Sequence, residues 1–281
     1  MNILDKIIEH KREEVKERKK LFPPKALEQN PFFSRPTFSM KEFVRRSDKS
    51  GIIAEFKRRS PSKGVINADA PVVQTTKGYV EAGASALSVL TDQQFFGGSN
   101  EDLSLARKNN SCPILRKDFT IDEYQIVEAK AIGADAILLI AAVLDPAASK
   151  KLASFAHSLG LEVLLEVHDD EELLLNLNAG ADLIGVNNRN LKTFVVSTEV
   201  SKKLAPRIPG EFVKVSESGI SSPETIATLR TYGYEGFLIG ENFMRNSRPE
   251  ISASEFIKKL SEVPNGRREQ KSASGDSETG V

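Results

Sequence analysis

Short apolar runs recur along most of this chain, and segments with helix-compatible spacing separate them. The runs are nearly continuous, which is typical of strands buried on both faces of a parallel sheet. Eight such strands are predicted, at residues 52–56, 84–90, 113–116, 135–141, 162–167, 182–186, 211–216 and 236–240.

Four of these runs resemble one another and follow a glycine: Gly83, Gly133, Gly180 or Gly233. The glycines lie about fifty residues apart, roughly two strand–helix units. Glycine readily adopts the left-handed conformation that ends a helix, so each one predicts a helix end just before a strand.

The alternation predicts an α/β fold, a single (β/α)8 TIM barrel with an N-terminal helical extension, because such barrels take about 250 residues. An open doubly wound sheet is the alternative. Against it, no G-x-G-x-x-G follows the first strand, and polar groups follow several strands rather than one crevice. We predict an extension at 1–48, the barrel at 49–263, and a polar tail at 264–281 that is expected to be disordered.

The extension begins with an amphipathic pattern. Ile3, Leu4, Ile7, Ile8 and Val15 lie among charges at roughly helical spacing, and two prolines after Phe22 would stop the helix. The helix could plug the bottom of the barrel or cover its mouth, and the pattern leaves both roles open.

Composition narrows the classes of function. Thirty-nine basic residues balance 39 acidic ones, so no overall charge favours nucleic acid or anionic lipid. No apolar run approaches the roughly 18 residues of a membrane span, and no secretory signal opens the chain, so a cytoplasmic location is expected. The single Cys112 excludes an intrachain disulfide, and three scattered histidines give no metal-ligand spacing, so no metal is expected.

Charged residues end several of the strands. Alternation along the first strand places Glu55 and Lys57 on the same side as Ile53, facing the barrel axis, as an inward ion pair. A purely structural pair is about as probable as a functional one. The loop R-R-S-P-S-K-G that follows favours function, since its hydroxyls and cations suit a substrate anion.

Lys117 and Glu166 end two further strands. A lone lysine after a strand is usually solvated, but a lysine held near carboxylates stays protonated and can donate a proton to a carbonyl oxygen. We therefore predict Lys117 as general acid. Glu166 follows Val163, Leu164 and Leu165 and is the best candidate for general base.

The last three strands end in polar loops. Asn187 and Arg189 can both face the site, with the guanidinium suited to a substrate carboxylate, whereas Asn188 fits loop capping better. The loops after the last two strands are a common phosphate site in such barrels. The predicted phosphate contacts are Ser218, Gly219, Gly240 and the main-chain N–H of Glu241.

Seven motifs, taken together and in order, resemble indole-3-glycerol-phosphate synthase. They are I-A-E-F-K-R-R-S-P-S-K-G, L-T-D-Q-Q-F-F-G-G-S, I-L-R-K-D-F, L-L-E-V-H, I-G-V-N-N-R-N-L, S-E-S-G-I and I-G-E-N-F-M. The resemblance runs from the leading helix to about Met244, and any one motif alone would be only suggestive.

This resemblance implies closure of 1-(2-carboxyphenylamino)-1-deoxyribulose 5-phosphate to an indole, with loss of carbon dioxide and water, in tryptophan biosynthesis. It implies Lys117 as general acid, Glu166 as base and Lys57 in dehydration and anchoring, and leaves open which lysine protonates the departing hydroxyl. It further implies Phe96 and Phe119 as walls for the anthranilate ring, although core packing is equally compatible. The remaining pocket residues that it implies are Glu55, Ser60, Asn187, Arg189, Glu217 and Ser218.

Two other functions stay open on these residues: a Schiff-base aldolase-type barrel, and a phosphosugar-binding barrel without turnover. No cofactor is expected, because the substrate's ketone and arylamine act as electron sinks. The expected partner is a small phosphorylated substrate, with no nucleic acid and no membrane, and the expected state is a monomer or weak homo-oligomer.

Overall fold

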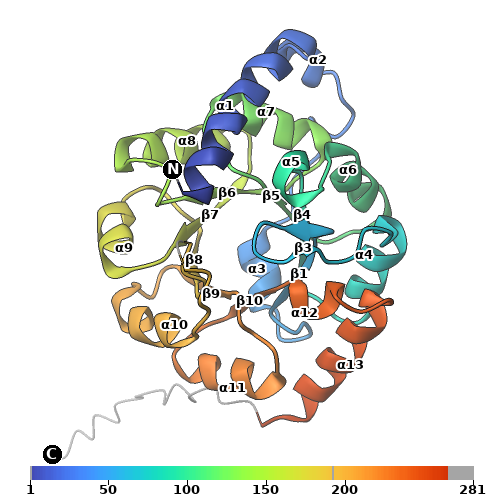
Figure 1. Ribbon diagram of the computed structural model, residues 1–281, viewed down its shortest axis with the longest axis vertical. Helices are drawn as coiled ribbons and strands as arrows, with labels where there is room; N and C mark the ends of the chain where they lie inside the picture. The colour runs from blue at the N-terminus through green and yellow to red at the C-terminus, as the bar shows by residue number, and fades with distance from the viewer. Residues whose placement is uncertain (1, 192, 265–281) are drawn as a thin grey trace, which may run out of the picture.

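Eight parallel strands close into one barrel in the computed structural model, which describes residues 2–191 and 193–264 (Figure 1). Around the ring β1 pairs with β10, and the order continues through β9, β8, β7, β6 and β5 to β4, which pairs with β1 again. The strands are β1 (Ile52–Phe56), β4 (Ala86–Leu90), β5 (Ile114–Lys117), β6 (Ala136–Ile140), β7 (Glu162–Val167), β8 (Leu183–Asn187), β9 (Val213–Glu217) and β10 (Gly236–Ile239). The predicted barrel is confirmed, and the open sheet is wrong.

Helices ring the barrel and alternate with the strands (Figure 1). All four glycines of the sequence repeat have a positive φ between 83° and 102° and immediately precede the next strand region, as predicted. The outer helices are α4 (Val72–Glu81), α6 (Asn100–Asn109), α7 (Glu123–Ile132), α8 (Pro146–Ser158), α9 (Asp170–Asn176), α10 (Glu199–Leu204), α11 (Pro223–Thr231) and α13 (Pro249–Glu262). Shorter elements in the connections are α5 (Gln93–Phe96), α12 (Glu241–Met244), the 3-10 helix η1 (Ala205–Arg207) and the hairpin of β2 (Arg59–Ser60) and β3 (Gly64–Val65).

The strands bury both of their faces. Ala54 and Phe56 of β1 belong to the apolar layer between the sheet and the helices, whereas Ile53 belongs to the cluster inside the barrel. Leu115, Leu164 and other inward side chains complete that interior cluster. Because side chains alternate along a strand, every second residue faces the barrel interior up to the C-terminal end of the strand, where these inward residues are charged.

A short helix of the extension, α3 (Met40–Arg45), closes the bottom of the barrel. Met40 and Val44 are fully or almost fully buried and join the interior cluster. The helix is tied to the beginnings of strands, because the hydroxyl of Ser39 donates to Glu162 at the first residue of β7 over 2.5 Å.

The leading helix α1 (Ile3–Leu21) lies at the other end of the barrel. Ile3, Leu4 and Ile7 line the cavity at the C-terminal ends of the strands, so α1 covers the mouth and does not plug the bottom. After α1 the chain turns through α2 (Pro24–Leu27) on the way to α3. The exact boundaries at residues 48 and 264 stay predictions, and the expected polar tail from 265 onward lies outside the described residues.

One buried lysine attaches α1 to the barrel. The Lys11 side chain is completely buried, and its Nζ lies 3.0 Å from Asp92 and 2.9 Å from both Asp118 and Glu14. Burial alone lowers the pKa of Lys11, but Asp118, Asp92 and Glu14 outweigh burial and raise this pKa above its ordinary value. Asp118 directly follows Lys117, so this anchor connects the helix over the mouth to the strand end that carries the predicted acid.

Among the described residues, no helix combines the length and the apolar character that crossing a membrane requires.

Replacing Lys11 by Met should destabilise the fold, because Asp92 and Asp118 would lose a buried counter-charge while the aliphatic stem is largely kept. Removing one partner of a buried pair costs about 3–5 kcal/mol, so the free energy of unfolding should fall by about that amount. Urea denaturation followed by circular dichroism measures it. Lys16→Met is the matched control, since Lys16 lies on the same helix with 63% of its side chain exposed. Equal unfolding midpoints for both variants and the parent would contradict this role of Lys11.

Candidate active site

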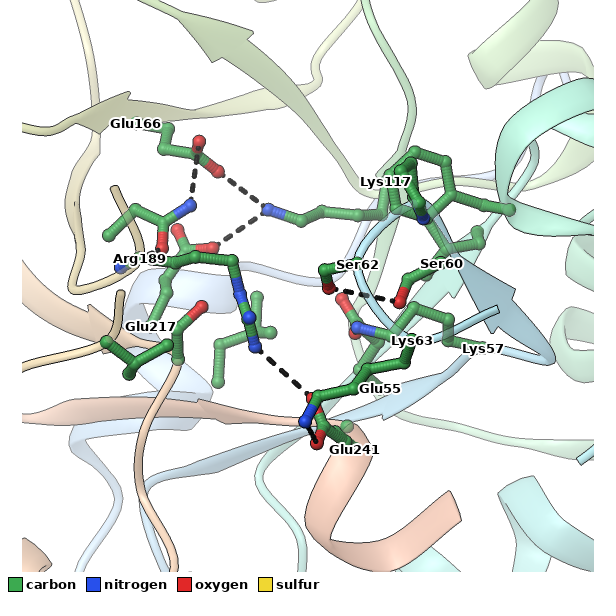
Figure 2. A pocket seen from close by; sticks show the side chains of 18 of the residues that line it. Glu55, Lys57, Ser60, Ser62, Lys63, Lys117, Glu166, Arg189, Glu217 and Glu241 are labelled. Carbon is green, nitrogen blue, oxygen red and sulfur yellow. Dashed lines mark hydrogen bonds and ion pairs between the residues drawn. The ribbon is translucent and has the colours of Figure 1, made fainter. Parts of the chain in front are cut away.

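The C-terminal ends of the strands surround one cavity of about 450 Å³. Every site residue predicted from the sequence lines it, although the residues come from both halves of the chain (Figure 2). They are Glu55, Lys57, Ser60, Phe96, Lys117, Phe119, Glu166, Asn187, Arg189, Glu217, Ser218, Gly219, Gly240 and Glu241.

Lys117 lies at the centre of the polar part of the cavity. Its Nζ donates to Glu166 Oε2 over 2.9 Å and to Glu217 Oε2 over 2.8 Å, and only 13% of the side chain is exposed (Figure 2). Burial lowers the pKa of Lys117, but Glu166, Glu217 and Glu55 outweigh burial and raise it above the ordinary value. Lys117 is therefore a protonated donor held inside the cavity.

Glu166 divides its two oxygens between different partners. Oε2 accepts from Lys117, and Oε1 accepts from Asn187 Nδ2 over 3.1 Å. Burial by itself raises the pKa of this carboxyl, but Lys117 and His168 outweigh burial and hold the pKa well below its usual range. Glu166 is therefore an ionised carboxylate that can accept a proton.

Glu217 is a carboxyl of different character, although it contacts the same lysine. Burial and the nearby charge of Glu166 raise the pKa of Glu217 to about 7, against the opposing effect of Lys117. Its Oε1 is buried and has no hydrogen-bond partner among the described residues. Two carboxyls with opposite pKa shifts around one ammonium group are the arrangement expected of separate acid and base roles.

Two glycines make room for the carboxylates of the cavity. A Cβ atom at Gly185 on β8 would overlap Oε1 of Glu217, and one at Gly240 would overlap Oε1 of Glu55. Neither glycine has a positive φ, so the requirement is space and not backbone conformation. Gly240 was predicted only as a phosphate contact. The structure shows a second reason for glycine at this position, because a side chain would overlap Glu55.

Glu55 and Lys57 form the inward ion pair that alternation predicts. Lys57 Nζ lies 2.5 Å from Glu55 Oε1, and 18% of the lysine side chain is exposed. Lys57 therefore reaches the cavity from just after β1, and only β4 lies between β1 and β5, which carries Lys117.

Arg189 forms an ion pair with Glu241, a residue that was predicted to bind phosphate through its main-chain N–H. Its Nη2 lies 3.2 Å from Glu241 Oε2, and Lys63 Nζ lies 3.4 Å from Glu241 Oε1 (Figure 2). Glu241 is the first residue of α12, so its main-chain N–H remains available at a helix start while its side chain turns toward the two cations.

The loop after β9 holds an unusual backbone conformation. Ser218 has a φ of 66° and Gly219 a φ of 76°, and a non-glycine residue in this region is a strained feature typical of functional loops. Asn188 stabilises the turn, because its Nδ2 donates to the carbonyl oxygen of Ser218 and to Ser216 Oγ, each over 3.0 Å. Asn188 is buried and supports the loop, which agrees with its predicted structural role.

An apolar wall faces this polar region. The rings of Phe96 and Phe119 have centroids 5.8 Å apart, and both line the cavity together with Ile3, Leu4 and Ile7 of α1. Both phenylalanines therefore lie where an aromatic ring in the cavity could contact them, and their role as walls for the anthranilate ring stays a prediction.

Two contributors were missed by the sequence reasoning, Lys63 and His168. The cations of the loop that contains Lys63 were expected to suit a substrate anion, but Lys63 was not singled out as a site residue. His168 shares the parity of Glu166 on β7, and alternation alone would have pointed to it. No group of histidine, cysteine or acidic side chains suited to a metal ion occurs in residues 2–191 and 193–264.

Comparisons with known proteins agree with this geometry. A family model described as indole-3-glycerol phosphate synthase matches residues 4–259. An indole-3-glycerol phosphate synthase of Bacteroides thetaiotaomicron is 51% identical over 259 residues, which cover 92% of this chain and 99% of that protein. The protein of the same name from Caldanaerobacter subterraneus is 43% identical and covers 92% of this chain and 98% of its own length.

Solved structures with low identity share the fold. A thiamine phosphate pyrophosphorylase from Pyrococcus furiosus gives a TM-score of 0.58 at 16% identity, covering 80% of this chain and 98% of that one. A structure titled "Native KDPGal structure" gives 0.55 at 14% identity, covering 78% and 96%. At this identity the likeness concerns the barrel alone.

The pKa of Glu217 predicts a pH-dependent difference in stability. Between pH 4.5 and about 7, Glu217 keeps its proton in the folded state but has lost it in the unfolded state. The resulting stabilisation of the folded state is complete below pH 4.5 and is lost as the pH rises to about 7. The Glu217→Gln variant has no carboxyl group to titrate at this position, so it lacks this pH dependence. The free energy of unfolding of the parent, minus that of the variant, should therefore fall by up to about 3 kcal/mol across this range. Urea unfolding of both proteins at several pH values measures it, and a constant difference would refute the raised pKa.

Proposed function

The chain belongs to the indole-3-glycerol phosphate synthase family, and we propose that Lys117, Glu166 and Lys57 divide the acid–base chemistry of its reaction among them. The enzyme converts 1-(2-carboxyphenylamino)-1-deoxyribulose 5-phosphate to indole-3-glycerol phosphate, carbon dioxide and water, in tryptophan biosynthesis. The observation that supports the division of roles best is the position of Lys117 Nζ between Glu166 and Glu217 inside the cavity.

In the first step, the aromatic carbon that bears the carboxylate attacks the ketone carbon of the ribulose chain. A new carbon–carbon bond forms, and the ketone oxygen receives a proton from Lys117 as negative charge develops on it. Lys117 suits this role because its surroundings keep it protonated in a buried site, where a charged donor is most effective.

In the following steps, the carboxylate leaves as carbon dioxide and its bonding electrons return to the ring system. The new hydroxyl gains a second proton and leaves as water, while the five-membered ring gives up a proton to Glu166. Lys57 reaches the same cavity from the end of β1 and can anchor the substrate or supply this second proton. Asn187 orients Glu166, and Glu55 holds Lys57.

The substrate phosphate would bind at the loops after β9 and β10. Ser218, Gly219, Gly240 and the main-chain N–H of Glu241 converge there, and Lys63 supplies a cation. Arg189 would exchange Glu241 for a substrate carboxylate, and Phe96 with Phe119 would contact the anthranilate ring. Ser60, from the β2–β3 hairpin over the cavity, would add a hydroxyl contact.

We further propose that the protein acts in the cytoplasm as a monomer or weak homo-oligomer, with its phosphorylated substrate as partner and without nucleic acid. The balanced charge of the chain supports the last point. No cofactor is required by the steps above, since each proton transfer has a side chain assigned to it.

Replacing Lys117 by Met should remove the proton donor while keeping an apolar stem of similar size. A positioned general acid contributes about 10²–10⁴-fold, so kcat should fall by that factor. Dissociation of a reduced, unreactive substrate analogue, measured by calorimetry, should change far less. Turnover followed by indole fluorescence that matches the parent would refute the acid assignment. Substrate trapped covalently on the parent by borohydride would instead support the aldolase-type alternative.

Gly219→Ala should weaken phosphate binding, because an alanine at a φ of 76° is strained and its Cβ would lie 2.6 Å from Val196 Cγ1. A shift of the loop that costs about 1.4 kcal/mol of binding raises KM about tenfold. Gly210→Ala is the matched control, since nothing lies within 4 Å of its Cβ position and its φ is not positive. Steady-state kinetics of the two variants decide the matter, and an unchanged KM in Gly219→Ala would place the phosphate elsewhere.

A further inference from the structure

His168 directly follows β7, two residues after Glu166, and is not among the residues that line the cavity. Its Nε2 is 3.3 Å from Glu166 Oε1, and its Nδ1 is 3.1 Å from Glu172 Oε2. The side chain is only 12% exposed. The ring therefore connects a carboxylate of the cavity with a carboxylate of the next helix.

The position of the ring determines its protonation state. Nδ1 makes a hydrogen bond with Glu172 Oε2, whereas Nε2 lies within ion-pairing distance of Glu166 Oε1 without a hydrogen bond. Two carboxylates at these distances therefore favour an imidazolium over a neutral ring. Burial lowers the pKa of His168, but Glu166 and Glu172 outweigh burial and raise it to about 10.

Glu172 holds the ring in place from the side away from the cavity. It lies in the first turn of α9, where its main-chain N–H donates to Asp169 Oδ1 over 2.9 Å. Its Oε2 also accepts from the main-chain N–H of His168 over 2.7 Å. The helix start thus fixes both the backbone and the ring of His168.

The two oxygens of Glu166 consequently have different surroundings. Oε1 is contacted by Asn187 of β8 and by His168, whereas Oε2 is contacted by Lys117 of β5. When Lys117 turns to the substrate ketone, Oε2 loses its partner and becomes the free basic atom. Oε1 keeps its contacts with Asn187 and His168, so the carboxylate does not rotate and a positive charge stays close to it.

We propose that His168 is a positioning residue whose imidazolium, fixed by Glu172, holds Oε1 of Glu166 so that Oε2 is presented to the substrate as the proton acceptor. This inference rests on the proposed role of Glu166 as general base. It assigns His168 no direct contact with the substrate, in keeping with its place outside the residues that line the cavity.

The charge of the ring can be measured without any turnover. In ¹⁵N-labelled protein, both ring nitrogens of His168 should remain protonated at pH 8, with the signals assigned by their absence from His168→Gln. A neutral ring at pH 8 would overturn the proposal, whatever the activity of the variants.

Kinetics test whether the ring acts through Glu166. His168→Gln keeps a hydrogen-bond donor but removes the charge, so kcat should fall about tenfold while KM changes little, since only proton abstraction is impaired. The acid limb of the kcat–pH profile should move to higher pH by about one unit, because a nearby cation no longer favours ionised Glu166. Glu172→Gln, a second variant that leaves the ring itself in place, should shift both quantities in the same direction by less.

His157→Gln is the matched control. His157 also pairs with a carboxylate, Asp182, over 2.8 Å, but its side chain is 43% exposed and lies outside the cavity. This variant should keep the kcat and pH profile of the parent.

Glu166→Gln separates the two levels of the proposal. Turnover at the parental rate in this variant would remove the base assignment itself, independent of the ring's charge. Strongly reduced turnover in Glu166→Gln, together with an unchanged kcat and pH profile in His168→Gln, would leave the base in place and overturn only the role of His168.

Discussion

The structure at the C-terminal ends of the strands depends on pairing each buried charge with a group of opposite charge. Lys117 is buried with two carboxylates, and an isolated ammonium group in that position would lose several kcal/mol of hydration. Because each charge depends on a partner from another strand, the polar groups are stable only as a set. The same dependence separates the two carboxyls: Glu166, with more cations around it, is ionised, whereas Glu217 keeps its proton until the pH approaches about 7.

The closed ring makes this compensation possible between residues far apart in sequence. Lys117 and Glu217 are separated by 100 positions along the chain, yet their side-chain atoms are 2.8 Å apart. Parallel strands bring all of their C-terminal ends to one rim, and the narrow interior forces inward side chains into contact. The interior is so narrow that Gly185 and Gly240 are needed beside the carboxylates.

Much of the fold and site could be predicted from the sequence, since strands buried on both faces have long apolar runs and a strict two-residue period. That period placed Glu55 and Lys57 inside, and the strand ends pointed to Lys117, Glu166 and the polar loops after the last three strands. Ser60, Phe96, Phe119 and Glu217 came from the family resemblance alone. The place of α1 could not be predicted, because an amphipathic helix fits either end of a barrel, and α3 proved to be the plug. The burial of Lys11 and the pairing of Arg189 with Glu241 could not be predicted either, because both depend on packing between segments far apart in sequence.

The attachment of α1 has a consequence for the order of events during synthesis. Helix α1 needs Asp92 and Asp118, which are translated about 80 and 107 residues after Lys11, and the cavity that it covers also needs β10. Until then the apolar side chains of Ile7, Ile8 and Val15, buried in the finished protein, have no barrel to pack against. The nascent chain therefore exposes these apolar side chains until β10 has been made, and exposed hydrophobic surface of this kind favours aggregation.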